Sequence, residues 1–297
     1  MRRHTLRSSL PAARLSALRR SGGISARWLS PRPASGLREC RHLTAAIRFF
    51  VCAILALPAW AQIQDNSFLT EEAYNQDPGV VQHISIFQRD RYDQWTTSFT
   101  QEWPAPNLKH QLSYGLATIG SRLGDTSLNY RYQVLGDADA KLAVAARLTA
   151  TLPTGDWKRD EGYGAVGYQG ALATSLVLSP QFQEHFDLGL NFVPRARNPL
   201  GGRTDVEGFS LGHNIVWLPA NRFNVMFETV LSRSRGFDGW ENSAVISPGI
   251  RWSYDFPSGL QIVPGIGVPI GVGSSAGDRA VLLYLSFEHR FRAASGQ

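Results

Sequence analysis

Residues 282–291 read LLYLSFEHRF, and this stretch decides the fold. Leu283, Leu285, Phe287 and His289 stand at every second position, and the residues that alternate with them are Tyr284, Ser286, Glu288 and Arg290. Side chains two residues apart share one face of a β-strand, so one face suits lipid and the other suits water. A strand of this kind that ends on an aromatic residue is typical of the closing strand of a transmembrane β-barrel. The expected signal for the barrel-assembly machinery lies on the apolar face and consists of Leu283, Leu285, Phe287, His289 and Phe291.

A secretory signal peptide is predicted near the N-terminus. Residues 49–57 (FFVCAILAL) form an apolar run too short to span a bilayer, with arginines before it and small residues around Trp60 after it. This order predicts cleavage after Ala61, so residues 1–61 are expected to be a removed leader. The alternative for the apolar run is a buried core helix. The arginine-rich start also resembles a mitochondrial transit peptide, although a start codon placed too far upstream explains residues 1–44 more simply.

The basic charge of the chain belongs to this leader. The whole sequence carries a formal net charge of +6, but residues 1–61 hold eleven arginines and a single acid, Glu39. The mature chain is therefore acidic, at about −4, and its charge gives no argument for binding nucleic acid. Both cysteines, Cys40 and Cys52, also lie in the leader. We therefore expect neither a disulfide nor a cysteine metal site in the mature protein.

From Val80 onward, segments of about ten residues alternate apolar with small or polar residues, and turn residues separate them. No apolar run after the leader reaches the roughly 18 residues of a transmembrane helix. A membrane-embedded form must therefore be a closed barrel, which satisfies every backbone group in lipid. We predict an all-β fold, a transmembrane antiparallel up-and-down β-barrel of about twelve strands within residues 81–297, with ten or fourteen strands as alternatives. The predicted strands are 81–88, 94–103, 109–118, 126–135, 141–152, 165–178, 185–196, 207–218, 222–233, 242–254, 260–270 and 280–291.

The connections between these segments support the topology. Connections after even strands are short, whereas those after odd strands include the longer stretches 153–164, 197–207 and 234–241. A barrel with both termini in the periplasm has short turns at one end and longer loops at the other. Three prolines inside the tenth and eleventh strands remove ladder donors and predict bulges or kinks there, at Pro248, Pro264 and Pro269.

An N-terminal segment, residues 62–80, precedes the first predicted strand. Ser67 can cap a short helix over residues 67–76, with Glu71 and Glu72 in its early turns. Such a helix could plug the barrel or lie beneath it in the periplasm. The alternative is an ordered lead into the first strand without a helix.

Several stretches resemble the outer-membrane family associated with the meta-pathway of phenol degradation. They are Leu152-Pro153-Thr154-Gly155-Asp156, Asn191-Phe192 with Pro194-Arg195-Ala196, Ser247-Pro248-Gly249, and residues 265–271 (GIGVPIG). The similarity covers roughly residues 81–291. The resemblance implies an outer-membrane barrel with a transporter-like role in the uptake of small compounds, with aromatic or apolar molecules among the candidates. It does not imply phenol itself.

Charged residues are expected only on the interior face of the predicted strands, which is what a water-filled or ion-paired lumen requires. In one interpretation, they line a constriction that selects solutes by field and size. In the other, they pair across a narrow lumen and hold the barrel together. No catalytic residue, metal site or cofactor is expected. The predicted lumen-lining residues are Glu102, Arg131, Arg147, Asp187, Glu228, Arg251, Glu288 and Arg290.

The sequence thus favours a bacterial outer-membrane channel or transporter for passive uptake of small solutes. It would be exported through the periplasm and would contact outer-membrane lipid and lipopolysaccharide. A structural outer-membrane barrel without transport is the alternative. A barrel phospholipase is less favoured, because its Ser–His pair would have to lie on the lipid face. Only His213 is expected at mid-strand on that face, and no outward serine is expected beside it.

Overall fold

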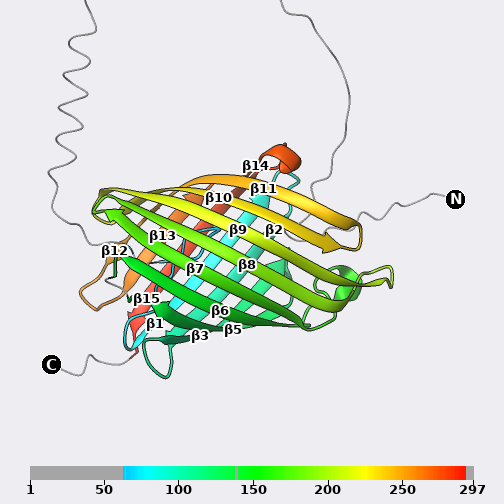
Figure 1. Cartoon of the computed structure of the whole chain (residues 1–297), viewed down its shortest axis with the longest axis horizontal. Coiled ribbons are helices and arrows are strands. Elements are labelled where there is room, and N and C mark those ends of the chain that lie inside the picture. Colours follow the sequence, from blue (N-terminus) through cyan, green and yellow to red (C-terminus); the bar gives the residue numbers. More distant parts are fainter. Residues whose placement is uncertain (1–62, 64, 138–139, 292–297) are drawn as a thin grey trace, which may run out of the picture. The chain divides into compact units, whose positions relative to one another are not determined.

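The chain forms a closed antiparallel β-barrel in a computed structural model that describes residues 63, 65–137 and 140–291 (Figure 1). The predicted leader, residues 1–61, lies outside the described residues. Within the described part of the chain, no helix is long and apolar enough to cross a membrane. The only helical turns there are two short 3₁₀ helices, η1 (Trp157–Arg159) and η2 (Gly273–Ser275).

Twelve strands make up the barrel wall, as predicted, and three two-residue strands accompany them. The wall strands are β1 (Val80–Asp90), β2 (Trp95–Pro104), β3 (His110–Ile119), β5 (Thr126–Leu135), β6 (Leu142–Leu152), β7 (Gly167–Ser179), β8 (Phe182–Arg197), β9 (Arg203–Ala220), β10 (Phe223–Gly236), β11 (Gly239–Trp252), β13 (Gln261–Gly267) and β15 (Ala280–Arg290). The short strands are β4 (Arg122–Leu123), β12 (Tyr254–Asp255) and β14 (Ile270–Gly271).

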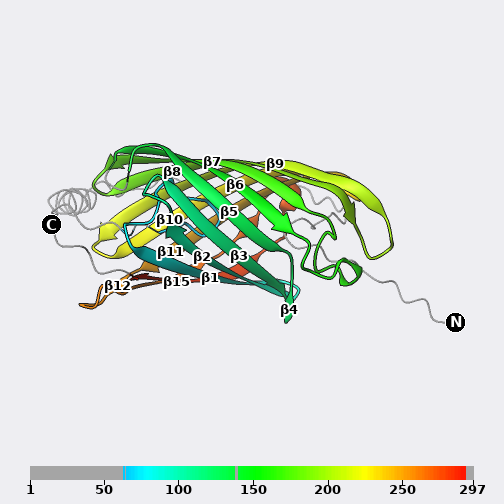
Figure 2. The same ribbon diagram turned by 90° about the horizontal axis from the view of Figure 1, so that it is seen from below.

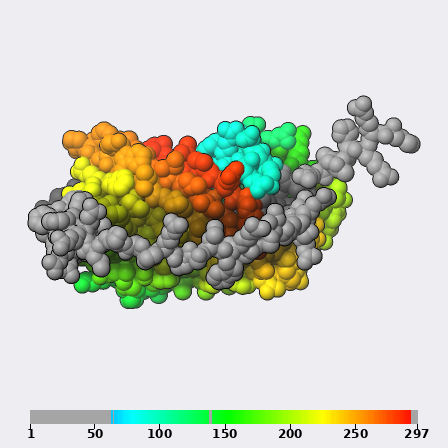
Figure 3. All heavy atoms as spheres, turned by 90° about the horizontal axis from the view of Figure 1, so that it is seen from above, coloured from blue at the N-terminus to red at the C-terminus, as the bar shows by residue number. Residues whose placement is uncertain are grey.

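The ring closes between the first and last strands. Strand β1 pairs with β15 in an unbroken register from Val80 opposite Arg290 to Asp90 opposite Ala280. Strand β15 in turn pairs with β13, and β13 pairs with β11. In Figure 3 the orange and red surface of β13 and β15 adjoins the cyan surface of the first strands. The barrel therefore leaves no free sheet edge, as a strand-built membrane protein requires.

Two of the predicted long connections are mostly strand. Strands β8 and β9 pair as far as Arg197 opposite Arg203, and β10 and β11 pair as far as Gly236 opposite Gly239. Residues 153–166, which carry η1, do form a long connection at that same end (Figure 2). In the stretches 197–207 and 234–241, by contrast, most residues pair across strands. Strands β8 to β11 therefore extend beyond their predicted ends.

The prolines act differently from the prediction. The β10–β11 register runs through Pro248 without a shift, and the β13–β15 register runs through Pro264 without one. Of the three proline positions, only Pro269 coincides with a break in the strand, between the end of β13 and the start of β14. The carbonyl oxygen of Pro248 still accepts a hydrogen bond from Val268 N at 3.0 Å, so a missing N–H alone does not force a bulge.

Burial alternates along the wall strands. In β5 the side chains of Asn129, Arg131 and Gln133 are buried, whereas those of Tyr130 and Tyr132 between them are exposed. The exposed set is apolar or aromatic, as a lipid-facing surface requires, and the buried set is polar. Polar side chains in such numbers can be buried only where they find hydrogen-bond partners.

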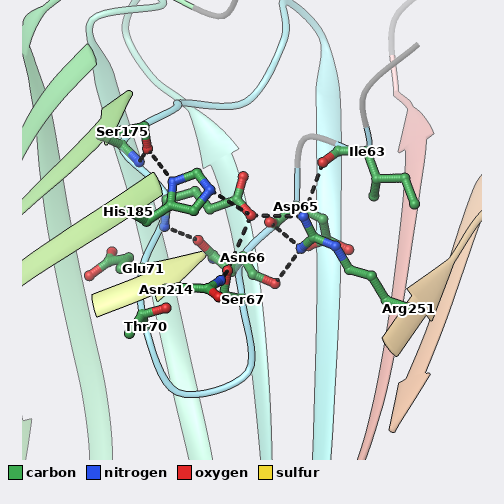
Figure 4. Close-up of polar contacts among 12 residues, drawn as sticks. Ile63, Asp65, Asn66, Ser67, Thr70, Glu71, Ser175, His185, Asn214 and Arg251 are labelled. Atoms are coloured by element: carbon green, nitrogen blue, oxygen red, sulfur yellow. Dashed lines mark hydrogen bonds and ion pairs between the residues drawn. The ribbon is translucent and has the colours of Figure 1, made fainter. Parts of the chain in front are cut away.

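The N-terminal part of the described chain provides many of those partners. Residues 63 and 65–79, here called the interior segment, run inside the barrel, where they contact inward-facing side chains of several strands (Figure 4). Of the two alternatives for residues 67–76, the short helix does not form, and the stretch is an ordered, non-helical lead into β1. Its backbone N–H groups donate to strand side chains instead of to carbonyls one helical turn back.

Candidate functional site in the barrel interior

Arg251 of β11 is the most heavily bonded group of the interior. Its side chain is fully buried. Nη1 donates to the carbonyl oxygens of Asp65 at 2.6 Å and Asn66 at 3.0 Å, and Nη2 donates to that of Ile63 at 3.1 Å (Figure 4). Nη2 also lies 2.8 Å from Oε1 of Glu72. The planar guanidinium thus binds several backbone carbonyls of the interior segment at once, because its donors point in fixed directions.

Glu72 links Arg251 to two further strands of the wall, β8 and β9. Its Oε1, which Arg251 binds, also accepts a hydrogen bond from Ser67 Oγ at 3.3 Å and lies 3.8 Å from Nε2 of His185 on β8. Ser67 Oγ accepts from Asn214 Nδ2 of β9 at 2.7 Å. One buried carboxylate of the segment therefore connects three nearby wall strands, β8, β9 and β11.

Two strand carboxylates hold the middle of the segment by its backbone. Oε1 of Glu228, on β10, accepts from the N–H groups of Leu69 at 2.7 Å and Thr70 at 3.0 Å, and from the Thr70 hydroxyl at 3.0 Å. Oδ2 of Asp187, on β8, accepts from Glu71 N at 2.5 Å. Carboxylates are strong acceptors, and here they satisfy backbone N–H donors of the non-helical segment.

Glu71 lies between two arginines of neighbouring strands. Nη1 of Arg131, on β5, is 3.3 Å from its Oε1, and Nε of Arg147, on β6, is 3.0 Å from its Oε2. Burial by itself would raise the pKa of Glu71, but the Arg147 and Arg131 guanidiniums outweigh it and hold the pKa below its ordinary value. Arg131 also donates through Nε to Asn75 Oδ1 at 2.9 Å, so it holds two points of the segment.

The other predicted lumen-lining residues have different surroundings. Glu102 is buried and accepts from Gln111 Nε2 at 2.6 Å. Glu288 lines a cavity of about 50 Å³ together with Asp65, Glu72 and Arg131. Arg290 is exposed at the end of β15. The structure therefore brings six of the eight predicted residues around the interior segment or next to its partners, places Glu288 at a remaining cavity, and leaves Arg290 outside this arrangement.

Asp65 is a buried acid that the sequence analysis did not single out. Its Oδ1 accepts hydrogen bonds from Gln82 Nε2 of β1 and from the Tyr284 hydroxyl of β15. Burial raises the pKa of Asp65 to about 6, which the nearby Arg251 guanidinium only partly offsets. No local pattern identifies this residue, since its partners lie on the two strands that close the barrel.

A buried serine and histidine also meet in the interior. Ser175 Oγ of β7 lies 2.7 Å from Nδ1 of His185, and the two residues face each other in the β7–β8 register. The same oxygen accepts from Ala73 N of the segment at 2.8 Å. Their positions on either side of a short turn are the one sequence signal that could have revealed this pair. Its place is the interior, away from the lipid face that a barrel phospholipase would require.

Aromatic and histidine rings lie on the outer surface, some at strand ends and some at mid-strand. Leu283 and Leu285 of the predicted assembly signal are exposed, and Phe291 is 52% exposed. His289 stacks on His83 of β1 with ring centroids 5.4 Å apart. His213 stacks on Phe186 with centroids 4.5 Å apart. These rings give the outside of the barrel an apolar, aromatic character that suits the membrane interface.

The barrel is similar in fold to solved outer-membrane proteins. A crystal structure of an outer membrane channel from Pseudomonas putida F1 aligns with a TM-score of 0.52 and 12% sequence identity, covering 78% of this chain and 100% of that chain. The NanC porin aligns with a TM-score of 0.51 and 10% identity, covering 69% of this chain and 98% of that chain. No protein-family model matches the sequence, and no curated protein matches it either. At these identities the likeness concerns the fold alone.

Proposed function

We propose that this protein is an outer-membrane channel or transporter for the passive uptake of small solutes, and that its interior segment restricts the lumen. The observation that carries the proposal is the combination of an apolar outer wall with a polar interior crossed by a separate, hydrogen-bonded segment. A barrel with a purely structural role could fill its lumen with side chains of its own strands. Here a segment from outside the sheet takes that place, and it can in principle move without opening the sheet.

Under this proposal, the charged side chains of the interior determine which ions pass through the channel. The acids around the segment include Asp65, Glu71, Glu72, Asp187 and Glu228, whereas the bases are Arg131, Arg147 and Arg251. A lumen with an excess of acids favours cations and neutral molecules over anions. The six predicted lumen-lining residues that lie around the segment or next to its partners are thus proposed both to hold the segment and to set selectivity.

The proposal includes the cellular setting. Residues 1–61 would direct export to the periplasm, and the apolar face of β15 would be read by the assembly machinery. The mature barrel would contact outer-membrane lipid and lipopolysaccharide. Membership of the family associated with the meta-pathway of phenol degradation is part of the proposal, supported by the residues that carry the resemblance and by the fold of the Pseudomonas putida F1 outer membrane channel.

We assign the Ser175–His185 pair a structural role and propose no enzymatic activity. The serine oxygen already accepts a backbone hydrogen bond from Ala73, and both side chains are fully buried. A nucleophile must reach its substrate, which this hydroxyl cannot do while the segment is in place.

Planar-bilayer conductance tests the proposed function. The mature chain, residues 62–297, is compared with a shorter chain that begins at Gly79. The shorter chain retains every strand, because the β1–β15 ladder is complete from Val80 onward. We expect small, discrete conductance steps from the mature chain and larger steps from the shorter one.

A heat-dependent shift on a gel shows for each protein that the barrel has folded. Folded barrels that conduct nothing in either form would contradict the channel function and favour the structural alternative. Equal conductance of both forms would contradict the restricting role of the interior segment.

A further inference from the structure

An aromatic side chain of the interior segment lies in a recess of the barrel wall. Phe68 is only 4% exposed, although it belongs to a segment that crosses a polar interior. Its ring packs within a buried apolar cluster that includes Met226 of β10, Val263 of β13 and Leu282 of β15. The Tyr284 ring lies beside it, with centroids 5.2 Å apart and planes inclined by 39°. This arrangement is a favourable offset contact between two aromatic rings.

Three glycines form the floor of the recess. A Cβ added at Gly265 would lie 2.6 Å from Cζ of Phe68, one at Gly249 would lie 2.7 Å from Cε2, and one at Gly267 would lie 2.9 Å from Cδ2. Gly249 and Gly267 face each other across β11 and β13, and Gly265 faces Tyr284 across β13 and β15. Even a methyl group at any of the three positions would collide with the ring. Glycine in a strand interior weakens the strand, and one established reason for it is close approach of another group.

The recess is part of the wall, whereas its occupant is not. The glycines belong to paired strands of the closed sheet, but Phe68 belongs to a segment held by side-chain hydrogen bonds. If the segment withdraws, the wall keeps a hollow shaped for one flat six-membered ring and bordered by the Tyr284 ring. An apolar hollow of this kind stays dry and binds small apolar molecules, as engineered core cavities do.

We propose that this recess is a binding site for a single aromatic ring, and that Phe68 occupies it as an internal competitor until a solute displaces it. The inference rests on the proposed function and names a solute class for it: small monocyclic aromatic molecules. The two sequence stretches that supply the glycines, Ser247-Pro248-Gly249 and residues 265–271, thereby acquire a common role as the floor of one site.

Fluorobenzene binding, followed by ¹⁹F NMR on the mature chain in lipid nanodiscs, tests the proposal. Three proteins are compared: the unaltered chain, Phe68→Ala, and Phe68→Ala combined with Gly265→Val, which fills the vacated recess. We expect saturable binding to the unaltered chain and binding at least about tenfold tighter to Phe68→Ala, since the competitor is gone. The double variant should show only non-saturable partitioning into lipid.

Three results would overturn the proposal. Equal behaviour of all three proteins would mean that fluorobenzene does not use the recess. Binding to Phe68→Ala alone would mean that a solute cannot displace the native side chain. Equally effective competition by methylcyclohexane would mean that the site does not select a flat ring.

Ion conductance of the same three preparations separates this inference from the proposed function. Proteins that conduct but bind no fluorobenzene would contradict the aromatic site and leave the proposed channel function standing. Folded proteins that do not conduct ions would contradict the channel function, whether or not they bind fluorobenzene.

Discussion

Nη2 of Arg251 on β11 lies 2.8 Å from Oε1 of Glu72, and this ion pair joins the barrel wall to the segment inside it. Both side chains are almost completely buried, with 1% and 2% of their surfaces exposed. A buried pair of this kind contributes little net stability over an apolar pair, but loss of one partner leaves an uncompensated charge. The pair therefore sets where the segment lies. Its disruption should loosen the segment while the strand pairing of the wall stays intact.

Replacing Arg251 by Gln should release the interior segment. Removal of one partner of a buried ion pair costs about 3–5 kcal/mol, because the other charge is left buried and unpaired. We expect larger conductance steps and faster proteolysis within residues 65–78, with an unchanged heat-dependent gel shift. Arg251→Lys, which keeps the charge but loses the fork-shaped donor set, should give an intermediate result. Unfolding of the whole barrel in Arg251→Gln would instead show that the arginine supports the wall.

Acidification should loosen the segment through Glu71. Its folded pKa lies below the ordinary 4.5, so its contribution to docking is present above that value and is lost as the pH falls through the folded pKa. Conductance should therefore rise only when the pH falls below 4.5. Glu71→Gln should already be more open at neutral pH and should lack this transition. A transition that persists unchanged in Glu71→Gln would place the responsible group elsewhere.

Asp65 should act in the opposite direction and at higher pH. Burial raises its pKa from 3.8 to about 6, so its protonated form favours the docked segment, and that contribution is lost as the pH rises through about 6. Asp65→Asn mimics the uncharged form and should remove this loss. Proteolysis of the segment, measured from about pH 4.5 to 7, should slow less at low pH in the variant than in the unaltered chain. An identical pH profile in both proteins would contradict this role.

Arg147 should tune ion selectivity. Its side chain is 31% exposed, which makes it the most accessible of the three arginines that contact the segment. One unit charge acting over roughly 10 Å of water is worth about 0.4 kcal/mol, or about a factor of two in relative permeability. Arg147→Gln should raise the cation-over-anion permeability ratio by that factor, as read from the reversal potential in a potassium chloride gradient. Arg290→Gln, at an exposed strand end, is the matched control and should change the ratio less.

Ser175 should resist active-site labelling. Its oxygen is buried and already bonded to Ala73 N and His185, so a fluorophosphonate probe should not modify the folded protein. Ser175→Ala leaves the Ala73 N–H without its acceptor and should weaken segment docking by about 1–3 kcal/mol. Labelling of Ser175 in the folded barrel would revive the hydrolase alternative.

The strands and their faces were predictable because the strand period of two is a local property. The alternation of Leu128 with Asn129 or of Leu283 with Tyr284 needs no knowledge of neighbouring strands. The same parity placed Glu102, Arg131, Arg147, Asp187, Glu228 and Arg251 on the interior face before any contact was known. The turn and loop signals were weaker, since strand pairing extended β8 to β11 through residues that looked like loops.

The partners of those interior residues were not predictable from the sequence. The cap-like pattern at Ser67 allowed a short helix, but Glu228 and Asp187, more than a hundred residues away, accept hydrogen bonds from the backbone N–H groups of Thr70 and Glu71. Phe68 and the glycines of β11 and β13 likewise meet only because the ring of strands closes around the segment. The sequence by itself determined the barrel, its strands and their inner faces, since these follow from local alternation. Only the tertiary structure decided what fills the lumen, because that depends on contacts that form when distant strands surround one segment.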